Sequence, residues 1–219
     1  MILRNTSLGG CSMKMFKKSF LLFLTVSLLF CLPLAGCGNS SENSGKTESQ
    51  NTDSTQTDSA KKILVTMENG KTFTIETAPQ YAPKTVENFL NLVESGFYNG
   101  LTFHRVIEGF MAQGGDPKGN GTGGSDKTIK GEFADNGFKQ NTLSHTRGVV
   151  SMARSQNMDS ASSQFFICYD DAPHLDGQYA AFGKVIDGME TVDEFLKIPR
   201  DNADKPHTPI VIKSMEIVE

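Results

Sequence analysis

The stretch FHRVIEGFMAQGGD, Phe103 to Asp116, places a single arginine among apolar residues. If its first residues form a β-strand, side chains alternate between the two faces of the strand. Leu101, Phe103, Arg105 and Ile107 would then share one face. A guanidinium stays charged at ordinary pH, and burying it without a partner is costly. Either a structural carboxylate holds Arg105, or Arg105 borders a site that uses its charge.

The residues that follow favour a site. Phe110, Met111 and Gln113 come within a few positions of Arg105. Together they offer a cation, an amide that both donates and accepts hydrogen bonds, and large apolar side chains. This combination suits a peptide segment in which an apolar ring lies beside a polar carbonyl.

The N-terminus has the pattern of an export signal. Three lysines, Lys14, Lys17 and Lys18, precede the apolar run FLLFLTVSLLFCLPL at 20–34. A basic region before a short apolar region is typical of a secretory signal, and the run is short for a membrane span of about 20 residues. The LAGC that follows, at 34–37, resembles the lipobox of bacterial lipoproteins.

We therefore predict a lipoprotein signal peptide at 1–36 and lipidation of Cys37, which would become the mature N-terminus. Met1, Met13 and Met15 are all possible starts. The predicted location is extracytoplasmic, with the lipid anchoring the chain to the cell membrane. Both the outer face of a Gram-positive membrane and a Gram-negative periplasmic anchor fit this pattern.

Composition separates a tether from a folded domain. Residues 38–60, GNSSENSGKTESQNTDSTQTDSA, contain no large apolar side chain, so they cannot bury enough surface to fold. We predict a polar, disordered tether at 37–60, although a stalk that carries a binding motif stays open. The remainder, 61–219, has the size of one domain.

Charge and cysteine content exclude several classes of function. Four of the 21 basic residues and none of the 25 acidic ones precede the predicted cleavage, which leaves 17 basic residues and a net charge near −8. This balance argues against a nucleic-acid partner. Cys37 and Cys168 remain after cleavage, so no disulfide framework is expected. The four histidines show no paired metal-ligand spacing, so no metal site is predicted; they are His104, His145, His174 and His207.

The folded part reads as mainly β. Two β-prone runs flank Asn69-Gly70, which indicates a hairpin, and apolar spacing predicts helices in 82–98 and 189–197. Further strands are predicted at 101–107, 110–113, 148–153, 164–169, 180–185 and 209–218. Many short strands, Gly-rich turns and two helices favour a closed β-barrel with capping helices. Both faces of QFFICY, 164–169, are apolar, so either a capping helix or a ligand groove must cover its outer face.

Two other chemistries fit less well. GNGTGG, 119–124, has the spacing of a dinucleotide loop, but the residues after it lack helical periodicity, so a loop with permissive glycines is favoured. A Ser/His/Asp hydrolase could be assembled from His104 or His174 with Asp176. Such a triad depends on geometry that the sequence does not fix.

Several motifs in register resemble the cyclophilins, the peptidyl-prolyl cis-trans isomerases. They are FHRVIEGFMAQGGD, GTGG, GVVSMAR, SSQFFICYDDAPHLDGQYAAFGKV and GMETVD, and the resemblance covers about 63–218. It implies a closed eight-stranded antiparallel β-barrel capped by two α-helices, with a substrate groove on the outer barrel surface. It also implies proline-containing polypeptides as substrates and assistance to the folding of exported client proteins. No cofactor is expected, because isomerisation assisted by a hydrogen-bond donor requires none.

The resemblance assigns roles by motif. Arg105 is the catalytic arginine, and Phe110, Met111 and Gln113 line the proline pocket and the groove beside it. The remaining substrate-binding residues that it implies are Ala153, Arg154, Gln164, Phe166, His174, Leu175 and Tyr179.

This chain departs from the family at four positions. Arg154 takes a place often held by Asn, and Glu108 replaces the usual Pro. His174 stands where many eukaryotic members have Trp, and Tyr179 where they have His. The last two changes are at the rim of the proline pocket and bear on cyclosporin affinity more than on isomerase activity.

Two rival functions would use the same fold. One is a chaperone that binds proline segments without turnover, and the other is a surface adhesin in which the barrel is a scaffold. The intact Arg105 favours the enzyme, which we expect to act as a monomer.

Overall fold

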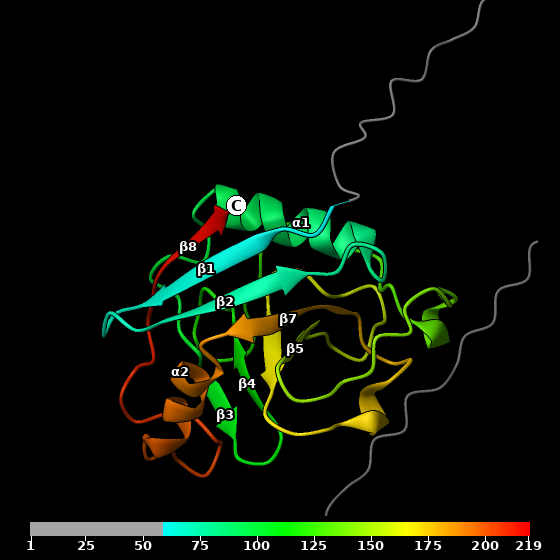
Figure 1. Cartoon of the computed structure of the whole chain (residues 1–219). Coiled ribbons are helices and arrows are strands. Elements are labelled where there is room, and N and C mark those ends of the chain that lie inside the picture. Colours follow the sequence, from blue (N-terminus) through cyan, green and yellow to red (C-terminus); the bar gives the residue numbers. More distant parts are fainter. Residues whose placement is uncertain (1–58) are drawn as a thin grey trace, which may run out of the picture. The chain divides into compact units, whose positions relative to one another are not determined.

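The structure is a computed structural model that describes residues 59–219 (Figure 1). The predicted signal peptide, Cys37 and the tether up to residue 58 lie outside the described residues. Within 59–219, no helix has both the length and the apolar character that crossing a membrane requires.

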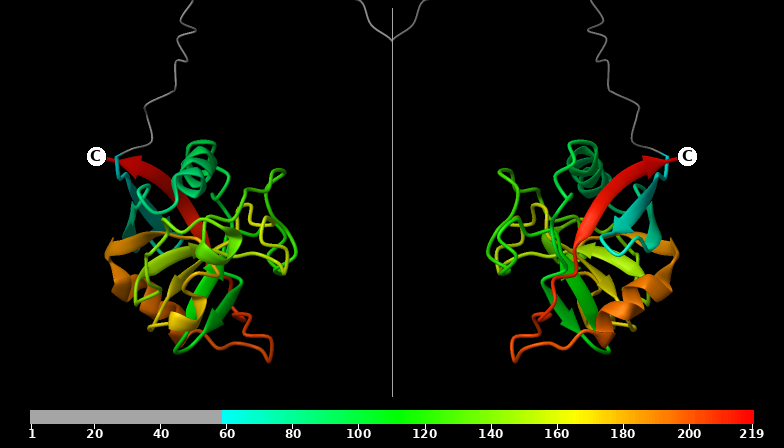
Figure 2. Two further views of the ribbon diagram at one scale, coloured as in Figure 1. Left: turned by 90° about the vertical axis from the view of Figure 1, so that its right-hand side faces the viewer. Right: turned by 90° about the vertical axis from the view of Figure 1, so that its left-hand side faces the viewer.

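Eight antiparallel strands form one strongly curled sheet in the order β3-β4-β6-β5-β7-β2-β1-β8 (Figures 1 and 2). The predicted strands are all present. They are β1 (Lys62–Met67), β2 (Thr72–Thr77), β3 (Arg105–Ile107), β4 (Met111–Gly114), β5 (Val149–Met152), β6 (Phe165–Cys168), β7 (Ala181–Asp187) and β8 (Ile212–Val218).

The predicted closure of the barrel is wrong. The edge strands β3 and β8 form no ladder with each other. Only the segment before β3 pairs with residues 210–212 at the start of β8, through the Thr102–Val211 bridge and backbone hydrogen bonds of Gly100, Leu101 and Phe103. The reason lies at the free edge of β3, where the Val106 N–H donates to the carbonyl of Asp204 at 2.9 Å. A loop around residues 200–206 therefore occupies the edge that β8 would need.

Both predicted helices are present. α1 (Pro83–Glu94) begins with proline in its first turn and buries Val86, Phe89 and Val93. α2 (Met189–Asp193) continues as the 3₁₀ turn η3 (Glu194–Lys197), so the predicted segment 189–197 is helical throughout but changes type. α1 lies across one end of the curled sheet and α2 near the other (Figures 1 and 2).

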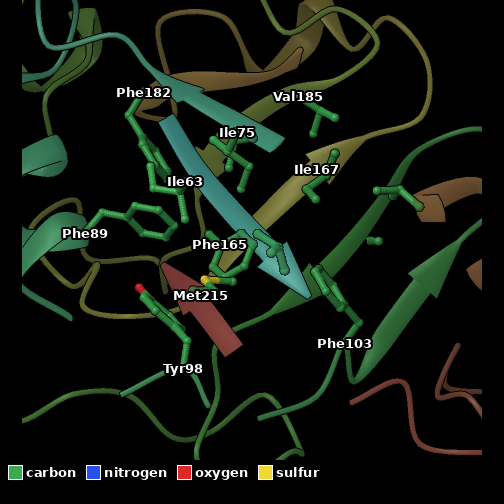
Figure 3. Close-up of a cluster of buried hydrophobic side chains, with 14 of the residues drawn as sticks. Ile63, Ile75, Phe89, Tyr98, Phe103, Phe165, Ile167, Phe182, Val185 and Met215 are labelled. Atoms are coloured by element: carbon green, nitrogen blue, oxygen red, sulfur yellow. The ribbon is translucent and has the colours of Figure 1, made fainter. Parts of the chain in front are cut away.

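An aromatic cluster fills the concave side of the sheet (Figure 3). Phe165 of β6 packs edge-to-face against Phe89, Tyr98 and Phe103, with ring centroids 5.5, 5.6 and 5.8 Å away. A second, smaller apolar cluster contains Phe166 and Cys168, the other face of β6. Ala172 and Leu175 pack into this outer cluster, so the 3₁₀ turn η2 (Pro173–Leu175), and neither α-helix, covers that face.

The expected shared face of Phe103 and Arg105 is also wrong. Phe103 and Val106 both belong to the interior core, whereas Arg105 is exposed. In a regular strand, amides two residues apart point to the same side. Here the His104 N–H donates to Gln113 in β4 and the Val106 N–H donates to Asp204 on the opposite side. The backbone therefore turns over at the start of β3 and directs Arg105 outward.

Candidate active site

A pocket of about 230 Å³ opens against the outer apolar cluster, and we call it the Arg105 pocket. Strands β3, β4 and β6 and the segments after β5 and around η2 supply its walls. Its nine lining residues all belong to the set implied by the resemblance: Arg105, Phe110, Met111, Gln113, Ala153, Arg154, Phe166, Leu175 and Tyr179.

Arg105 is the cation at one wall of this pocket. It lies directly across from Gln113 in the β3–β4 pairing, and its Nη1 is 3.5 Å from Gln113 Oε1, the outer limit for a hydrogen bond. No carboxylate of residues 59–219 forms an ion pair with Arg105. The described part of the chain thus offers no structural carboxylate for Arg105, and most of its N–H groups are free to face a ligand.

Gln113 is held from behind by Gln164. The Gln113 amide Nε2 donates to Gln164 Oε1 at 2.8 Å. Gln164 Nε2 in turn donates to the carbonyls of Gly123 and Gly121, at 2.7 and 3.1 Å. Gln164 does not line the Arg105 pocket, so the structure places it as the support of Gln113.

The glycine-rich segment 119–124 is a loop organised around Asp116. The buried Asp116 carboxylate accepts hydrogen bonds from the N–H groups of Lys118, Asn120 and Gly121, at 2.8, 3.0 and 2.6 Å. Burial alone would raise the pKa of Asp116, but these backbone donors outweigh it and lower the pKa. A Cβ on Gly123 would collide with the carboxylate. No helix follows within residues 125–133, so the segment is not a dinucleotide loop.

The opposite wall of the pocket is aromatic. Phe166 of β6 is buried, and the Tyr179 ring meets it edge-on at 6.0 Å. Phe110 is half-buried and packs on His174, with ring centroids 5.6 Å apart. His174 therefore touches the wall from outside and does not line the pocket. Glu108 is exposed in the turn between β3 and β4.

Arg154 lines the Arg105 pocket and is fixed by hydrogen bonds to backbone carbonyls. Its Nε and Nη2 donate to the Gln178 carbonyl at 3.0 and 2.9 Å, and Nη1 donates to the Ser155 carbonyl at 2.9 Å. The guanidinium also lies over the Tyr179 ring, 4.6 Å from its centroid. Sequence reasoning placed Arg154 at the groove but missed this brace.

The hydrolase triad considered from the sequence does not form, because Asp176 pairs with His145 and with neither His104 nor His174. Within residues 59–219, Asp176 forms no hydrogen bond with His104 or His174; its Oδ1 lies 2.8 Å from His145 Nδ1, and His145 Nε2 lies 3.0 Å from Ser151 Oγ. Ser151 is completely buried, so its hydroxyl cannot reach a substrate. Burial lowers the pKa of His145. No group of three potential metal ligands occurs in the described residues.

Comparison with known proteins identifies the family. The model for cyclophilin type peptidyl-prolyl cis-trans isomerases/CLD matches residues 62–217. The chain belongs to the cyclophilins. It is therefore a peptidyl-prolyl cis-trans isomerase, and its substrates are proline-containing polypeptides.

Relatives of this cyclophilin occur in animals, fungi and bacteria. It is 46% identical over 144 residues to peptidyl-prolyl cis-trans isomerase-like 3 of Rattus norvegicus, which covers 65% of this chain and 88% of the relative. It is 49% identical over 127 residues to a peptidyl-prolyl cis-trans isomerase of Helicobacter pylori, covering 58% and 75%. Isomerase-like 2 of Gibberella zeae is 40% identical over 145 residues, 66% of this chain, but the match spans only 25% of that longer relative.

Solved structures agree with the fold. A cyclophilin type isomerase of Cryptosporidium parvum superposes with a TM-score of 0.66 at 35% identity, and the match covers 74% of this cyclophilin and 99% of the other chain. The same protein in the presence of the dipeptide Ala-Pro gives a TM-score of 0.65 at 36% identity, covering 72% and 99%.

Proposed function

We propose that this cyclophilin isomerises X-Pro bonds of exported proteins outside the cytoplasm, using the Arg105 pocket and held at the membrane by a lipid on Cys37. One observation carries the assignment of the site. The pocket joins Arg105, which has no carboxylate partner within residues 59–219, to a wall of apolar and aromatic side chains. Isomerisation of a prolyl peptide bond requires both: a hydrogen-bond donor for the twisted amide and an apolar surface for the proline ring.

Arg105 is the proposed catalytic residue. Resonance in the peptide bond creates a barrier that makes X-Pro interconversion take tens to hundreds of seconds. In the twisted transition state the prolyl nitrogen regains its lone pair. A fixed donor aimed at that lone pair acts only on the twisted state, and such selective stabilisation is what accelerates a reaction. Arg105 can supply the donor without forming a covalent bond.

The other pocket residues position the substrate. Phe110, Met111, Phe166 and Leu175 offer apolar surface to a proline ring, and Gln113 offers an amide to a backbone group. The Cryptosporidium parvum relative, crystallised in the presence of Ala-Pro, supports a prolyl peptide as the occupant. Reaching milliseconds requires roughly 10⁴–10⁵-fold acceleration, about 5–7 kcal/mol, which oriented hydrogen bonding and positioning can supply.

The leader supports the location. A basic start, an apolar run and LAGC precede the polar segment 38–60, as in bacterial lipoproteins. An isomerase anchored in this way meets polypeptides after their export, when slow X-Pro bonds delay their folding. The chain is proposed to act as a monomer.

A proline isomerisation assay tests the function. The purified protein should accelerate cis-trans exchange of an Ala-Pro peptide, measured by coupling cleavage of the trans form to a protease. Fractionation of the native cells should place the protein with the membranes. Peptide binding without any acceleration would instead support the chaperone that lacks turnover.

A further inference from the structure

A second hollow adjoins the Arg105 pocket, and Ala153 and Arg154 line both. We call it the side hollow. It has a volume of about 310 Å³, and its lining is polar: Gly121, Thr122, Gly123, Ala153, Arg154, Ser155, Ser160, Ser162 and Gln164. Any peptide that seats a proline ring in the Arg105 pocket and runs toward Arg154 would pass into this hollow.

The charged side chains that line the two hollows are both arginines, and the Asp116 carboxylate behind the glycine loop is bound to backbone N–H groups. Arg105 and Arg154 are the charged residues that line the Arg105 pocket, and Arg154 is the charged residue that lines the side hollow. No carboxylate lines either, and none within residues 59–219 forms an ion pair with either arginine. The chain as a whole carries a formal net charge of −4. The two arginines therefore give the hollows a positive lining in a protein that is negatively charged overall.

Arg154 is also held in place before a substrate arrives. Its guanidinium donates to the carbonyls of Gln178 and Ser155, which are neutral acceptors and leave the positive charge uncompensated. The Tyr179 and Phe133 rings lie 4.6 and 5.1 Å from it. A side chain already fixed loses little conformational entropy when it meets a ligand, and its charge cannot be lost by deprotonation.

We propose that Arg154 makes this isomerase selective for prolyl bonds with an acidic side chain, Asp or Glu, within two residues of the proline. This inference rests on the proposed seating of the proline ring in the Arg105 pocket. Consecutive Cα atoms are about 3.8 Å apart, so a neighbouring residue of the substrate reaches the wall that Arg154 shares between the two hollows. Asn, which the family often carries at this position, offers no such charge.

Matched peptides measure the selectivity. The full chain, purified in a mild detergent, is assayed by NMR exchange spectroscopy, which needs no coupling protease. Three peptides carry Glu, Gln or Lys in the second position before an otherwise identical Ala-Pro segment, and three more carry them after it. In at least one series, kcat/KM should fall in the order Glu, Gln, Lys, with Glu about two- to fivefold above Gln, as for a partly exposed ion pair. Added salt should shrink the ratio.

Substitutions assign the effect to Arg154. Arg154→Asn and Arg154→Gln, two neutral variants, should bring the Glu-to-Gln ratio to about one even if the lost brace lowers turnover of every peptide. Arg154→Lys keeps the charge without the planar fork and should retain most of the ratio. Lys213→Gln removes one exposed charge from β8, which lines neither hollow, and should leave the ratio unchanged.

The outcomes separate this inference from the proposed function. Equal turnover of the Glu and Gln peptides by the wild type overturns the selectivity and leaves the isomerase intact. A ratio that persists in both neutral variants overturns the assignment to Arg154. If no peptide is turned over by a folded protein, the proposed function itself fails.

Discussion

Arg105 is the residue on which the proposed chemistry depends. Its guanidinium is exposed, its contact with Gln113 is at the limit of hydrogen bonding, and it forms no ion pair with a carboxylate in the described part of the chain. A structural arginine would show strong partners instead. Arg105 therefore has N–H donors available for the catalytic role that we propose for it.

Removing that donor should cost catalysis and little stability. We expect Arg105→Ala to lower kcat/KM by about 10²-fold or more, the cost of losing one preorganised donor, about 2.7–4 kcal/mol. Arg105→Lys keeps the charge but loses the planar fork and should also fall well below wild type. The protease-coupled assay measures both, after circular dichroism has confirmed folding. Full turnover by a folded Arg105→Ala protein would refute the role.

Phe110 tests the apolar wall separately. The half-buried ring packs on His174 and lines the pocket. We expect Phe110→Ala to weaken binding of a prolyl peptide by about ten- to a hundredfold, because burying such a ring contributes about 1.5–3 kcal/mol. Peptide titration followed by NMR gives the dissociation constant. An unchanged constant would place the proline ring elsewhere.

At the scale of elements, the loop after β4 supports the site. Asp116 gathers the loop amides, the loop carbonyls hold Gln164, and Gln164 holds Gln113, which faces Arg105. A buried carboxylate is thus connected to Arg105, the proposed catalytic residue, through a series of hydrogen bonds, and it does not line the Arg105 pocket. Asp116 is a positioning residue in this arrangement.

We expect Asp116→Ala to lower kcat about tenfold with a smaller effect on peptide affinity, because the apolar wall stays in place. The protein should also lose about 1–3 kcal/mol of stability, since loop amides lose their acceptor. Glu132→Ala is a matched control: Glu132 is also a buried carboxylate, and it accepts the amides of Lys84 and Thr85 at the start of α1 and lines neither hollow. Steady-state kinetics compare the two. An equal loss of kcat in both would mean that the effect is general destabilisation.

The sequence predicted the elements better than their closure. Strands and helices follow from local alternation and helical spacing, which is why all eight strands and both helices were found. Closure depends on which segment takes the free edge of β3, and that is decided by Asp204, whose backbone adopts a positive φ of 62° and whose carbonyl accepts the Val106 amide. A local sequence pattern cannot predict the contact between Val106 and Asp204, because these residues are almost a hundred positions apart.

The residues that line the pocket were predictable from the sequence, but those that support them from behind were not. Motif resemblance named every residue that lines the Arg105 pocket. It missed Asp116, because a carboxylate that binds backbone amides leaves no mark in side-chain spacing. It also missed His145, whose partner Asp176 is 31 positions away and whose ring lies on Phe166, 6.1 Å between centroids.

At the scale of the molecule, buried titrating groups connect stability to pH. Burial lowers the pKa of His104 and of His145 below the ordinary value of 6.5. The unfolded chain therefore binds more protons than the folded chain once the pH falls below about 6.5. Stability is complete above that pH and is lost as the pH falls toward the lowered pKa values. The lowered pKa of Asp116 adds a further loss below its ordinary value of 3.8.

Urea unfolding at a series of pH values checks this dependence. We expect the free energy of unfolding to decrease steadily between pH 7 and pH 5. His145→Gln removes one titrating group and should flatten that decrease, although it lowers stability at pH 7 by breaking the contacts with Asp176 and Ser151. A wild-type stability that is constant over this range would contradict the prediction.

The anchor and the chemistry should be separable in the whole molecule. Every residue of the Arg105 pocket lies between 105 and 179, whereas the predicted lipid site is Cys37. We expect Cys37→Ala, expressed in a bacterium that processes lipoproteins, to lose incorporation of labelled palmitate and to leave the membrane fraction. Its kcat/KM on an Ala-Pro peptide should equal that of the wild type, because the substitution removes the membrane anchor and leaves every pocket residue in place.

Cys168→Ala is the matched cysteine control. Cys168 is buried in the outer cluster, so its substitution should leave palmitate labelling unchanged. Continued labelling of Cys37→Ala would place the lipid elsewhere, and a loss of turnover in the soluble protein would show that the anchor contributes to catalysis.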